Sequence, residues 1–388
     1  MASNDCSGLI LLNMSPRSDW ERGVVNRNYH IAQGLLNSGK FSHIISVDFL
    51  PFSFKKKLRV LLKEKPWKRN AHTVYWRPYI RIDRDAKQKQ LYHVTATSLK
   101  HLPAILRRLS FPQQLTIWSY NPFTAPLFQK FPEAKIIFDA VDNWADHPVY
   151  ASQAEQLREQ YTIIQKRADV IFTVSEGLVD FFGKQKNVFY IPNGVDVAHF
   201  GHAQCHMPIP ISIDQTAGER LIGYHGVIQS RVNFAIIEYL AQQHPEWHQV
   251  LIGPVWKDVV KELQRIVNTY PHVHALGSVS YNQLPSAIAC FDVAMIPHKI
   301  DAFTHSMNPL KMYEYLACGK PIVATPIAGS DQFQDLITTA ISPEDFSQAI
   351  TRALQEHTPE LRQRRISMAQ GHSWQHRIQK MFEIMDRS

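Results

Sequence analysis

The sequence predicts an α/β protein made of two doubly wound domains that face a cleft. Short apolar runs, which are typical of buried strands, alternate with longer amphipathic segments, which are typical of helices. This alternation occurs twice along the 388 residues, and a chain of that length is too long for a single core. Between the two runs, Gly201–Gly218 contains the stretch His206-Met-Pro-Ile-Pro, which indicates a linker.

The first run of elements begins with a strand over Leu9–Asn13. A helix over Asn26–Asn37 follows, because apolar residues recur there at helical spacing and Gly39 comes next as a stop signal. The remaining expected elements are strands over Ile44–Asp48, Leu115–Trp118, Lys135–Asp139 and Val170–Val174 and a polar helix over Ser152–Arg167.

The second run restarts at residue 221 and keeps the same alternation to the end of the chain. The expected strands are Leu221–Tyr224, His248–Ile252, Val273–Leu276, Val293–Ile296 and Pro321–Thr325. The expected helices are Asn233–Gln243, Val255–Asn268, Tyr281–Ala289, Leu310–Ala317 and a helical tail. Strand–helix alternation at this spacing favours parallel sheets that are covered by helices on both faces.

These elements predict four segments with different tasks. Residues 1–200 form an N-terminal domain, 201–218 a linker, 219–372 a C-terminal domain, and 373–388 a terminal helix that crosses back to the first domain. In open α/β sheets, ligands bind beyond the carboxyl ends of the strands. The cleft between the two domains is therefore the expected binding site.

The composition is that of a globular protein from a reducing compartment. Hydrophobic residues make up 45% and charged residues 20%, which excludes a disordered chain, and no apolar stretch is long enough to cross a bilayer. The four cysteines lie far apart without a C-x-x-C pair, so we expect neither a zinc ribbon nor a disulfide framework. Because the N-terminus lacks the features of a signal peptide, we expect a cytoplasmic protein.

Positive charge is concentrated in the first half of the chain. Residues 1–200 carry 27 Lys and Arg against 17 Asp and Glu, a net charge of +10, whereas the rest of the chain has a net charge of −2. Residues 51–110 alone hold 16 basic and three acidic residues. A basic patch on one side of a protein indicates an anionic partner, which is a membrane surface, a nucleic acid or an acidic substrate.

The most informative stretch for chemistry is Ser306–Thr325. It predicts a loop, then a helix with Asn308 near its N-cap and Pro309 near its first position, then a turn and a buried strand. A helix start at a cleft presents free N–H groups and the positive end of the helix dipole, which together bind anions. Lys311 adds a formal charge there, and Glu314 can accept the hydroxyls of a ribose. The alternative is that Lys311 and Glu314 form an ordinary solvated i,i+3 pair.

Two carboxylates, Asp139 and Asp142, follow a predicted strand and therefore face the expected cleft. A carboxylate there can take the proton from an acceptor hydroxyl or align that hydroxyl. The alternative is an N-cap and turn, for which the i,i+3 spacing is equally suited. Gly23, in the turn after the first strand, allows close approach of a substrate to the backbone, or it is a plain helix-entry glycine.

Five motifs in order resemble retaining glycosyltransferases of family 4, which have the GT-B fold. The motifs are Ile191-Pro-Asn-Gly-Val-Asp, Gln249-Val-Leu-Ile-Gly-Pro, Val273-His-Ala-Leu-Gly-Ser-Val with the following Leu284-Pro, Asp292-Val-Ala-Met-Ile-Pro and Ser306–Thr325. The likeness spans almost the whole chain. Within the family, Phe138-Asp-Ala-Val-Asp-Asn-Trp and Asp19-Trp20 resemble a branch that contains glycosyltransferases of teichuronic-acid-type polysaccharides.

The resemblance implies two Rossmann-like domains and the transfer of a sugar from a nucleoside diphosphate to an acceptor with retained anomeric configuration. The C-terminal domain would bind the donor and the N-terminal domain the acceptor. Glu314 matches the second Glu of the family's E-x7-E motif, which holds the ribose hydroxyls. The main chain around Met307–Leu310 matches the loop that cradles the diphosphate. We expect no cofactor and no metal, with the nucleoside-diphosphate sugar as the donor substrate.

The sequence departs from the family pattern at three places. Ser306 stands where the first Glu of E-x7-E is usual. After the strand that ends near Gly226, Val227 replaces the family's Arg, and only Arg231 is left to stand for the Lys. Tyr120-Asn-Pro stands in place of the His-Glu-Pro segment, so Tyr120 becomes the expected acceptor contact. The leaving diphosphate still needs positive charge, for which Arg231 and Lys311 are the candidates.

The basic segment Phe52–Asn70 has the composition of a helix that lies in the headgroup plane of a membrane. Phe and Leu side chains alternate with eight Lys and Arg residues, and Trp67 lies near the end. We expect Lys55–Arg69 to bind an anionic membrane surface, where a lipid-linked acceptor would be met. The alternative is a surface helix of the N-terminal domain whose cations are solvated.

Three classes of function were weighed. A glycosyltransferase of cell-surface polysaccharide or glycolipid synthesis fits the motif order. A sugar-nucleotide 2-epimerase shares the fold but not this order of motifs. A non-catalytic protein that binds nucleic acid or a membrane would use the basic patch, but no helix-turn-helix, RNA-recognition or zinc-finger signature is present, so we expect no nucleic-acid partner. We expect no metal, because no Asp-x-Asp motif is predicted at the end of a strand. The motif Asp83-Arg-Asp85 lies in a basic, charged segment.

Overall fold

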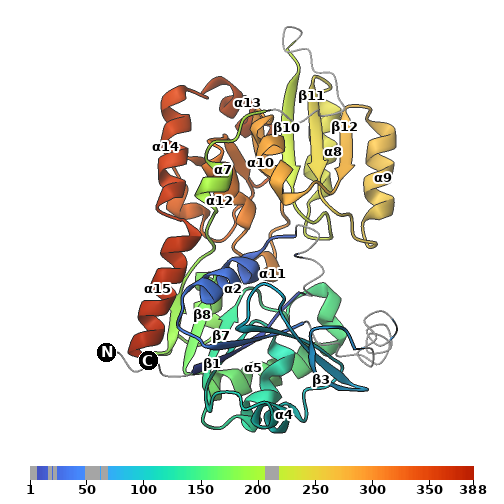
Figure 1. The fold of residues 1–388 in the computed structure, drawn as a ribbon. Helices are drawn as coiled ribbons and strands as arrows, with labels where there is room; N and C mark the ends of the chain where they lie inside the picture. The colour runs from blue at the N-terminus through green and yellow to red at the C-terminus, as the bar shows by residue number, and fades with distance from the viewer. Residues whose placement is uncertain (1–6, 16–19, 21–23, 49–61, 63–68, 206–217) are drawn as a thin grey trace. The chain divides into compact units, whose positions relative to one another are not determined.

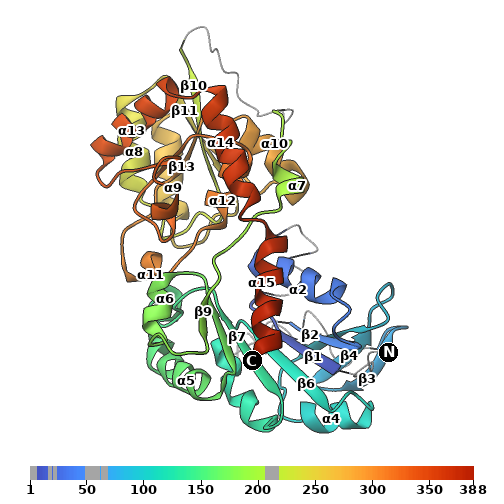
Figure 2. The same ribbon diagram turned by 90° about the vertical axis from the view of Figure 1, so that its left-hand side faces the viewer.

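A computed structural model describes the chain except for residues 1–6, 16–19, 21–23, 49–61, 63–68 and 206–217. The chain divides into two compact units, one of residues Met1–Val174, Leu178–Ile191 and Met381–Ser388, and one of Ser175–Gly177 and Pro192–Lys380. Most of the expected linker over 201–218 lies outside the described residues. Each unit contains a sheet with helices on both of its faces (Figure 1, Figure 2).

The first unit contains a nine-stranded sheet in the order β3-β4-β5-β2-β1-β6-β7-β8-β9. Its strands are β1 (Ser7–Leu12), β2 (His43–Val47), β3 (Thr73–Arg77), β4 (Ile80–Arg84), β5 (Leu91–Ala96), β6 (Gln114–Ser119), β7 (Lys135–Ala140), β8 (Val170–Thr173) and β9 (Val188–Tyr190). The pairs β3–β4 and β4–β5 are antiparallel and the others are parallel. Strands β2 to β5 lie on one side of β1 and strands β6 to β9 lie on its other side, so the order of the strands along the chain reverses between β1 and β6.

Helices and 3-10 turns join these strands. They are α2 (Arg27–Asn37), α4 (Leu102–Arg108), η1 (Pro122–Lys130), η2 (Pro148–Gln153), α5 (Ala154–Arg167) and α6 (Glu176–Phe181), which crosses the division between the units. The helix α2 begins where the side chain of Asn26 accepts a hydrogen bond from the N–H of Tyr29, as an N-cap does. The apolar face of α2, which includes Ile31 and Leu35, is buried.

The outer strands of this sheet were not predicted from the sequence. In β4, Ile80 and Ile82 are fully buried and alternate with Arg81 and Asp83. This is the two-residue period of a half-buried strand. Because the segment is so rich in charge, its alternation is easily mistaken for a solvated surface stretch.

The second unit contains a six-stranded, wholly parallel sheet in the order β12-β11-β10-β13-β14-β15. Its strands are β10 (Arg220–His225), β11 (Trp247–Ile252), β12 (Val273–Gly277), β13 (Val293–Ile296), β14 (Ile322–Ala324) and β15 (Ile337–Thr339). Counted along the chain, this is the 3-2-1-4-5-6 order of a dinucleotide-binding fold, whose switch point lies between the first and fourth strands. The corresponding strands here are β10 and β13.

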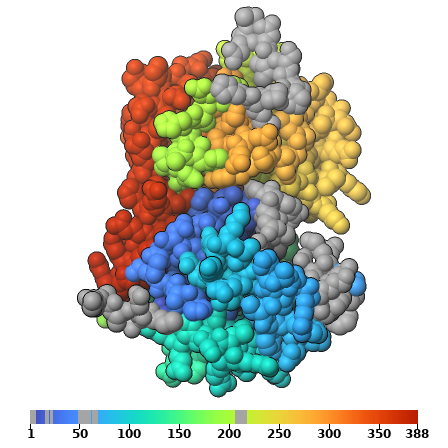
Figure 3. All heavy atoms as spheres, viewed as in Figure 1, coloured from blue at the N-terminus to red at the C-terminus, as the bar shows by residue number. Residues whose placement is uncertain are grey.

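Two apolar clusters cover the two faces of this sheet. One contains residues of α8 (Phe234–Gln243), α9 (Val260–Thr269) and α13 (Pro343–Gln355). The other contains residues of α7 (Val197–Phe200), α10 (Leu284–Ala289), α12 (Leu310–Ala317) and α14 (Pro359–Gln370). The atoms of α9 and α14 lie on opposite sides of the unit (Figure 3). Short helices η4 (Tyr281–Gln283), α11 (Ala302–His305) and η5 (Ser330–Phe333) complete the unit.

The last helix, α15 (Trp374–Arg387), has residues in both units. Its final residues belong to the first unit, where Asp386 forms an ion pair of 2.7 Å with Lys40 and the Met385 carbonyl accepts a hydrogen bond from Lys135. Its earlier residues, up to Lys380, belong to the second unit.

One pair of cysteines departs from the sequence-based expectation. Cys205, just before the first residue of the undescribed segment, forms a disulfide with Cys290 at the end of α10, although 85 residues separate the two. The expectation of reduced cysteines is wrong for this pair, because proximity in the fold is invisible in the linear spacing. Cys318 is free and buried.

Candidate donor site at the switch point of the second sheet

The candidate site lies at the switch point of the second unit, beyond the carboxyl ends of β10 and β13. The chain that follows β10 pairs with the chain that follows β13, since Val232 and His298 form an antiparallel bridge. The N–H of Lys299 also donates a hydrogen bond of 2.7 Å to the carbonyl of Arg231. These contacts fix the segments that carry Arg231 and His298 side by side at the ends of adjacent strands.

Helix α12 begins with Leu310, and Pro309 occupies its N-cap in an extended conformation without a capping side chain. The expectation that Asn308 caps this helix is therefore wrong by one residue. The Asn308 side chain instead accepts a hydrogen bond of 2.9 Å from the N–H of Asn193 and donates one of 3.2 Å to the Ala328 carbonyl. The loop before α12 is thus tied down on both sides, while no side chain caps the first N–H groups of the helix.

Lys311, in the first turn of α12, is buried with only 6% of its surface exposed. Its ammonium nitrogen lies 4.8 Å from the ring centroid of Tyr224, a cation–π contact. Burial lowers the pKa of Lys311 well below its usual value, the charge of Arg231 lowers this pKa further, and Glu314 opposes both effects. A buried ammonium beside an arginine is costly unless an anion joins it.

Gly226, directly after β10, makes room for Lys311. It has a φ of +126°, a conformation that favours glycine. A Cβ atom on Gly226 would lie only 3.0 Å from Cε and 3.1 Å from Nζ of Lys311. The backbone of β10 can therefore approach this side chain closely only because the residue is a glycine.

Arg231 is partly exposed and is held at both ends of its guanidinium group. With the Gln229 amide turned so that its oxygen faces the arginine, that oxygen accepts hydrogen bonds of 3.0 Å from Nε and 3.1 Å from Nη2. Nη1 contacts the sulfur of Met307 at 3.8 Å. Arg231 is thus oriented by neutral groups, and its charge remains available to an anion.

Glu314, one turn further along α12, faces His225, the last residue of β10. Oε2 of Glu314 lies 2.9 Å from Nε2 of His225, and the two side chains are about nine-tenths buried, with 10% and 9% exposed. The pair is close but not aligned as a hydrogen bond, and neither atom has another polar partner among the described residues. Glu314 is therefore an acidic group with unused hydrogen-bonding capacity, and its charge acts on Lys311.

The structure brings together most of the residues that were predicted to bind the donor, but not all of their side chains take part. Gly226, Arg231, Lys311 and Glu314 converge. Ser306, which stands in place of the family's first Glu, donates its hydroxyl to the Phe303 carbonyl at 2.8 Å. The other predicted donor residues, Met307, Asn308, Pro309 and Leu310, form the loop and the first turn of α12.

Sequence reasoning missed two histidines of this site, His225 and His298. His298 is 1% exposed, and neither of its ring nitrogens has a partner in the described part of the chain. Burial lowers the pKa of His298 well below its usual value, and the charges of Lys311 and Arg231 lower it further. Both histidines come at or just after a strand end at the switch point, which is the sequence signal that identifies them.

The predicted acceptor residues lie in the first unit. Asp139 is fully buried, and both its oxygens accept hydrogen bonds from Nε of Arg27, at 3.0 and 3.1 Å. Asp142 is partly exposed, whereas Tyr120 has only 1% of its surface exposed. Of the two carboxylates, Asp142 is thus the one with accessible surface. Gly23 and most of the segment Lys55–Arg69 lie outside the described residues.

Burial raises the pKa of Asp139, and Arg27 opposes this effect. Burial also raises the pKa of the Tyr120 hydroxyl well above its usual value, with a further contribution from the nearby Asp139. The expectation that no Asp-x-Asp stands at a strand end is wrong, since Asp83 lies in β4 and Asp85 directly follows its last residue, Arg84. The Asp83 carboxylate is engaged by Thr73 and Arg81, at 2.7 Å each, and Asp85 pairs with His93 at 2.9 Å.

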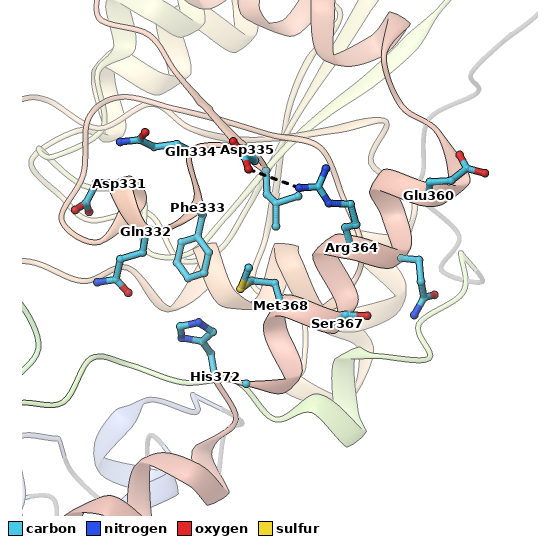
Figure 4. A pocket seen from close by; sticks show the side chains of 13 residues that line it. Asp331, Gln332, Phe333, Gln334, Asp335, Glu360, Arg364, Ser367, Met368 and His372 are labelled. Atoms are coloured by element: carbon cyan, nitrogen blue, oxygen red, sulfur yellow. Dashed lines mark ion pairs between the residues drawn. The ribbon is translucent and has the colours of Figure 1, made fainter.

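A separate hollow of about 960 Å³ lies in the second unit between the η5 segment and α14. Figure 4 shows the ring of His372 beside Phe333 and an ion pair between Asp335 and Arg364, whose charged atoms are 3.6 Å apart. None of the predicted donor residues lines this hollow. The switch point, where those residues converge, is therefore the candidate site.

The described residues lack two further features. They include no group of three or more His, Cys, Asp or Glu side chains arranged to hold a metal ion. No helix among them has the length and apolar character needed to cross a membrane.

Comparisons with known proteins show what the chain is similar to. Residues 222–356 match the family described as glycosyl transferases group 1. A Bacillus subtilis (strain 168) protein named TuaH, to which a role as teichuronic acid biosynthesis glycosyltransferase is attributed, is 24% identical over 233 residues. The match covers 57% of this chain and 58% of that relative, so it spans little more than half of either protein.

Solved structures share the fold over the whole chain. Sucrose-phosphate synthase from Thermosynechococcus elongatus superposes with a TM-score of 0.70 at 14% identity and 98% coverage of both chains. Anabaena HepE, solved with UDP-glucose, has a TM-score of 0.67 at 16% identity, covering 98% of this chain and 100% of HepE. A mutant of S. aureus TarM, solved with fondaparinux, alpha-GlcNAc-glycerol and UDP, has a TM-score of 0.62 at 10% identity, with coverage of 98% and 99%.

The predicted fold class is confirmed by the two sheets and by these neighbours. The family match begins within β10 and ends just after α13, so it contains every side chain of the candidate donor site. The chain has the GT-B fold, and residues 222–356 of its second unit match the family of glycosyl transferases group 1.

Proposed function

We propose that this protein is a retaining glycosyltransferase of cell-surface polysaccharide synthesis. It moves a sugar from a nucleoside-diphosphate sugar to a glycan or lipid-linked acceptor. The observation that carries the proposal is the convergence of Lys311, Arg231 and Glu314 beside the start of α12, at the switch point of a parallel sheet. Two cations suit a diphosphate and a carboxylate suits the two hydroxyls of a ribose.

Each donor residue has a role that follows from its chemistry. Glu314 accepts hydrogen bonds from the ribose, while the N–H groups at the start of α12 face the diphosphate. Lys311 and Arg231 stabilise the negative charge that grows on the diphosphate as the bond to the sugar breaks. HepE, which shares the fold, was solved with UDP and glucose, and TarM was solved with UDP and alpha-GlcNAc-glycerol, which supports a nucleotide-sugar donor and a glycan acceptor.

The reaction breaks the bond between the anomeric carbon and the diphosphate oxygen and forms one between that carbon and the acceptor oxygen. The acceptor hydroxyl loses its proton to an oxygen of the leaving diphosphate or to a carboxylate, for which Asp142 is our candidate. In the first route, attack and departure occur on the same face, which retains the anomeric configuration. Because Lys311 and Arg231 supply positive charge to the leaving group, we propose that turnover survives treatment with a chelator.

The proposed donor site is tested with nucleoside diphosphates and one variant. UDP, GDP and ADP are screened by thermal shift, where a ligand at 100 times its Kd stabilises a protein by about 2.7 kcal/mol. We expect at least one of them to raise the Tm. In Glu314→Ala, the affinity for that nucleotide should fall by about tenfold or more, because hydrogen bonds to a charged group contribute about 1.5–3 kcal/mol each. No shift with any nucleotide, or an unchanged affinity in the folded variant, would contradict the proposal.

We also propose that the enzyme works on the cytoplasmic face of a membrane, held there by the basic segment Lys55–Arg69. This proposal rests on the sequence, since only Leu62 and Arg69 of that segment are described; Leu62 is 63% exposed and Arg69 stacks on Trp76 at 4.7 Å. Each basic residue near an anionic surface contributes about 1 kcal/mol.

The membrane proposal is tested by sedimentation with vesicles. Wild-type protein should bind anionic vesicles and not neutral ones, and its binding should fall with salt. A variant in which Lys55, Lys56, Lys57 and Arg59 are changed to Gln should lose most of this binding. A variant with Lys257 and Lys261 of the other unit changed to Gln serves as a control. Equal sedimentation of all three proteins would show that the segment is not a membrane anchor.

A further inference from the structure

Glu314 was predicted to bind the donor, but the histidine that contacts it, His225, was not. Nε2 of His225 lies 2.9 Å from Oε2 of Glu314, and both atoms are covered by the protein. The other carboxylate oxygen, Oε1, has no partner within the described chain and is not enclosed. One oxygen of Glu314 is therefore directed at the histidine, and the other is left for a ligand.

His225 is itself held in place before any ligand arrives. Its backbone N–H donates a hydrogen bond of 2.9 Å to the hydroxyl of Tyr315. Its ring packs edge-on against the ring of Tyr315, with centroids 5.1 Å apart and an interplanar angle of 86°. Because the residue also ends a central strand of the sheet, the imidazole is a rigid neighbour for the carboxylate.

A glutamate carboxylate is carried on two methylene groups and loses rotamer freedom when it binds a ligand. Fixing a glutamate side chain in one rotamer costs conformational entropy. A neighbour that restricts the side chain before binding removes part of that cost from the binding step. The present alignment falls short of a hydrogen bond, but a small rotation of either side chain would make one, as is usual in ligand-free sites.

We propose that His225 is a positioning residue for ribose recognition. Its Nε2–H holds one oxygen of Glu314, so that the other oxygen meets the hydroxyls of the donor ribose. The inference rests on the proposed function, since it gives a role to a neighbour of the ribose-binding carboxylate. Its signature is selectivity for ribose over deoxyribose, which a purely structural histidine would not influence.

The experiment measures the affinity of the full-length protein for UDP, GDP and ADP by calorimetry, each beside its 2′-deoxy and 3′-deoxy forms. Wild-type protein should prefer the ribonucleotide. In His225→Phe, which cannot donate, the ribonucleotide should bind about tenfold more weakly, the loss of one hydrogen bond to a charged group. The deoxy forms should change much less, so the ratio of ribo to deoxy affinity should collapse.

Two other variants make the test specific. His225→Gln places an amide N–H near the position of Nε2 and should restore part of the lost ratio. His244→Gln is the matched control, because His244 forms a comparable contact with Glu246, 3.0 Å long, away from the site. It should leave the ratio unchanged. Circular dichroism and the Tm confirm that each variant is folded.

The outcomes separate this inference from the proposed function. If none of the three ribonucleotides binds the wild-type protein, the proposed function fails and the inference fails with it. If a ribonucleotide binds and Glu314→Ala abolishes the preference for ribose, the proposed function stands. In that case, an unchanged ratio in folded His225→Phe overturns the inference, as does a Gln variant that is no better than the Phe variant.

Discussion

The ion pair between Arg27 and Asp139 gives the sharpest test of the physical argument. Nε and Nη2 of Arg27 lie 3.0 Å from Oδ1 of Asp139, and Nε also lies 3.1 Å from Oδ2. The side chains are 3% and 0% exposed. We predict that Arg27→Met strongly destabilises the first unit, because it leaves a buried carboxylate without its partner. Breaking a buried ion pair from one side costs about 3–5 kcal/mol.

The size of the effect in a melting experiment follows from the size of the unit. For 150–250 residues, a change of 1 kcal/mol shifts the Tm by about 2–4 °C, so a loss of about 3–5 kcal/mol lowers the Tm by about 6–20 °C. The measurement is differential scanning calorimetry of the full-length chain. A nucleotide bound to the second unit raises the stability of that unit, which identifies the transition of the first.

The deficit should also depend on pH in a defined direction. Burial already raises the pKa of Asp139, and Arg27 opposes that rise, so removing Arg27 raises the pKa further. A carboxyl group whose pKa is higher in the folded state stabilises that state fully below the unfolded pKa, and this contribution is lost as the pH rises through the folded pKa. The difference between Arg27→Met and wild type should therefore be largest near neutral pH and shrink on acidification.

A double variant decides whether the loss comes from the charge. In Arg27→Met with Asp139→Leu, the buried charge is absent, and most of the stability should return. A small, pH-independent loss in Arg27→Met, or no recovery in the double variant, would refute the reasoning. If the recovered double variant also retains transferase turnover, Asp139 has no role in the chemistry and Asp142 remains the candidate base.

Three further predictions concern the second unit. Lys311→Met should lower kcat by about 10²–10³ with unchanged folding, because one group that stabilises the leaving diphosphate is lost. A diphosphate favours the ammonium form of Lys311, so the affinity of the wild-type protein for nucleotide should fall as the pH rises through the lowered pKa of Lys311. The Met variant should lose this pH dependence. Gly226→Ala should lower the free energy of unfolding, measured by urea titration, by about 1–3 kcal/mol, since a side chain is strained at the φ of +126°. The variant should also bind nucleotide more weakly, because the added Cβ atom displaces Lys311, and an unchanged Kd would contradict the close approach of the two residues. Cys205→Ser removes the disulfide to Cys290 and should lower the Tm measured by calorimetry. The loss in the free energy of unfolding should be at most roughly 4–5 kcal/mol for a loop of this length. A reductant should have no further effect on the Tm of the variant.

Much of the fold could be predicted because its central strands are apolar runs bounded by turns. The predicted helix Leu310–Ala317 has the same bounds in the structure, and the predicted strand Val293–Ile296 is β13. The predictions failed where burial is one-sided. In β4 and β5, apolar residues alternate with charged or polar ones, and β15 has one buried residue of three. Such strands are held by their neighbours in the sheet and have little local signal of their own.

The candidate site was predictable where residues follow each other in one motif and not where the fold brings distant segments together. Lys311 and Glu314 come from a single helix, so that their proximity could be predicted from their spacing. His225 and His298 lie 73 positions apart and meet the site only because β10 and β13 are neighbours at the switch point. The disulfide between Cys205 and Cys290 escaped prediction for the same reason.

The charges of the site suggest why these particular groups were brought together. The burial of Lys311 and the charge of Arg231 both lower the pKa of Lys311, and Glu314 opposes these effects. The same two cations help to lower the pKa of the buried His298. These lowered pKa values reflect the positive charges that lie around the two buried groups. A diphosphate would supply negative charge there and stabilise the ammonium form of Lys311, so that binding favours the charge that the departing diphosphate needs.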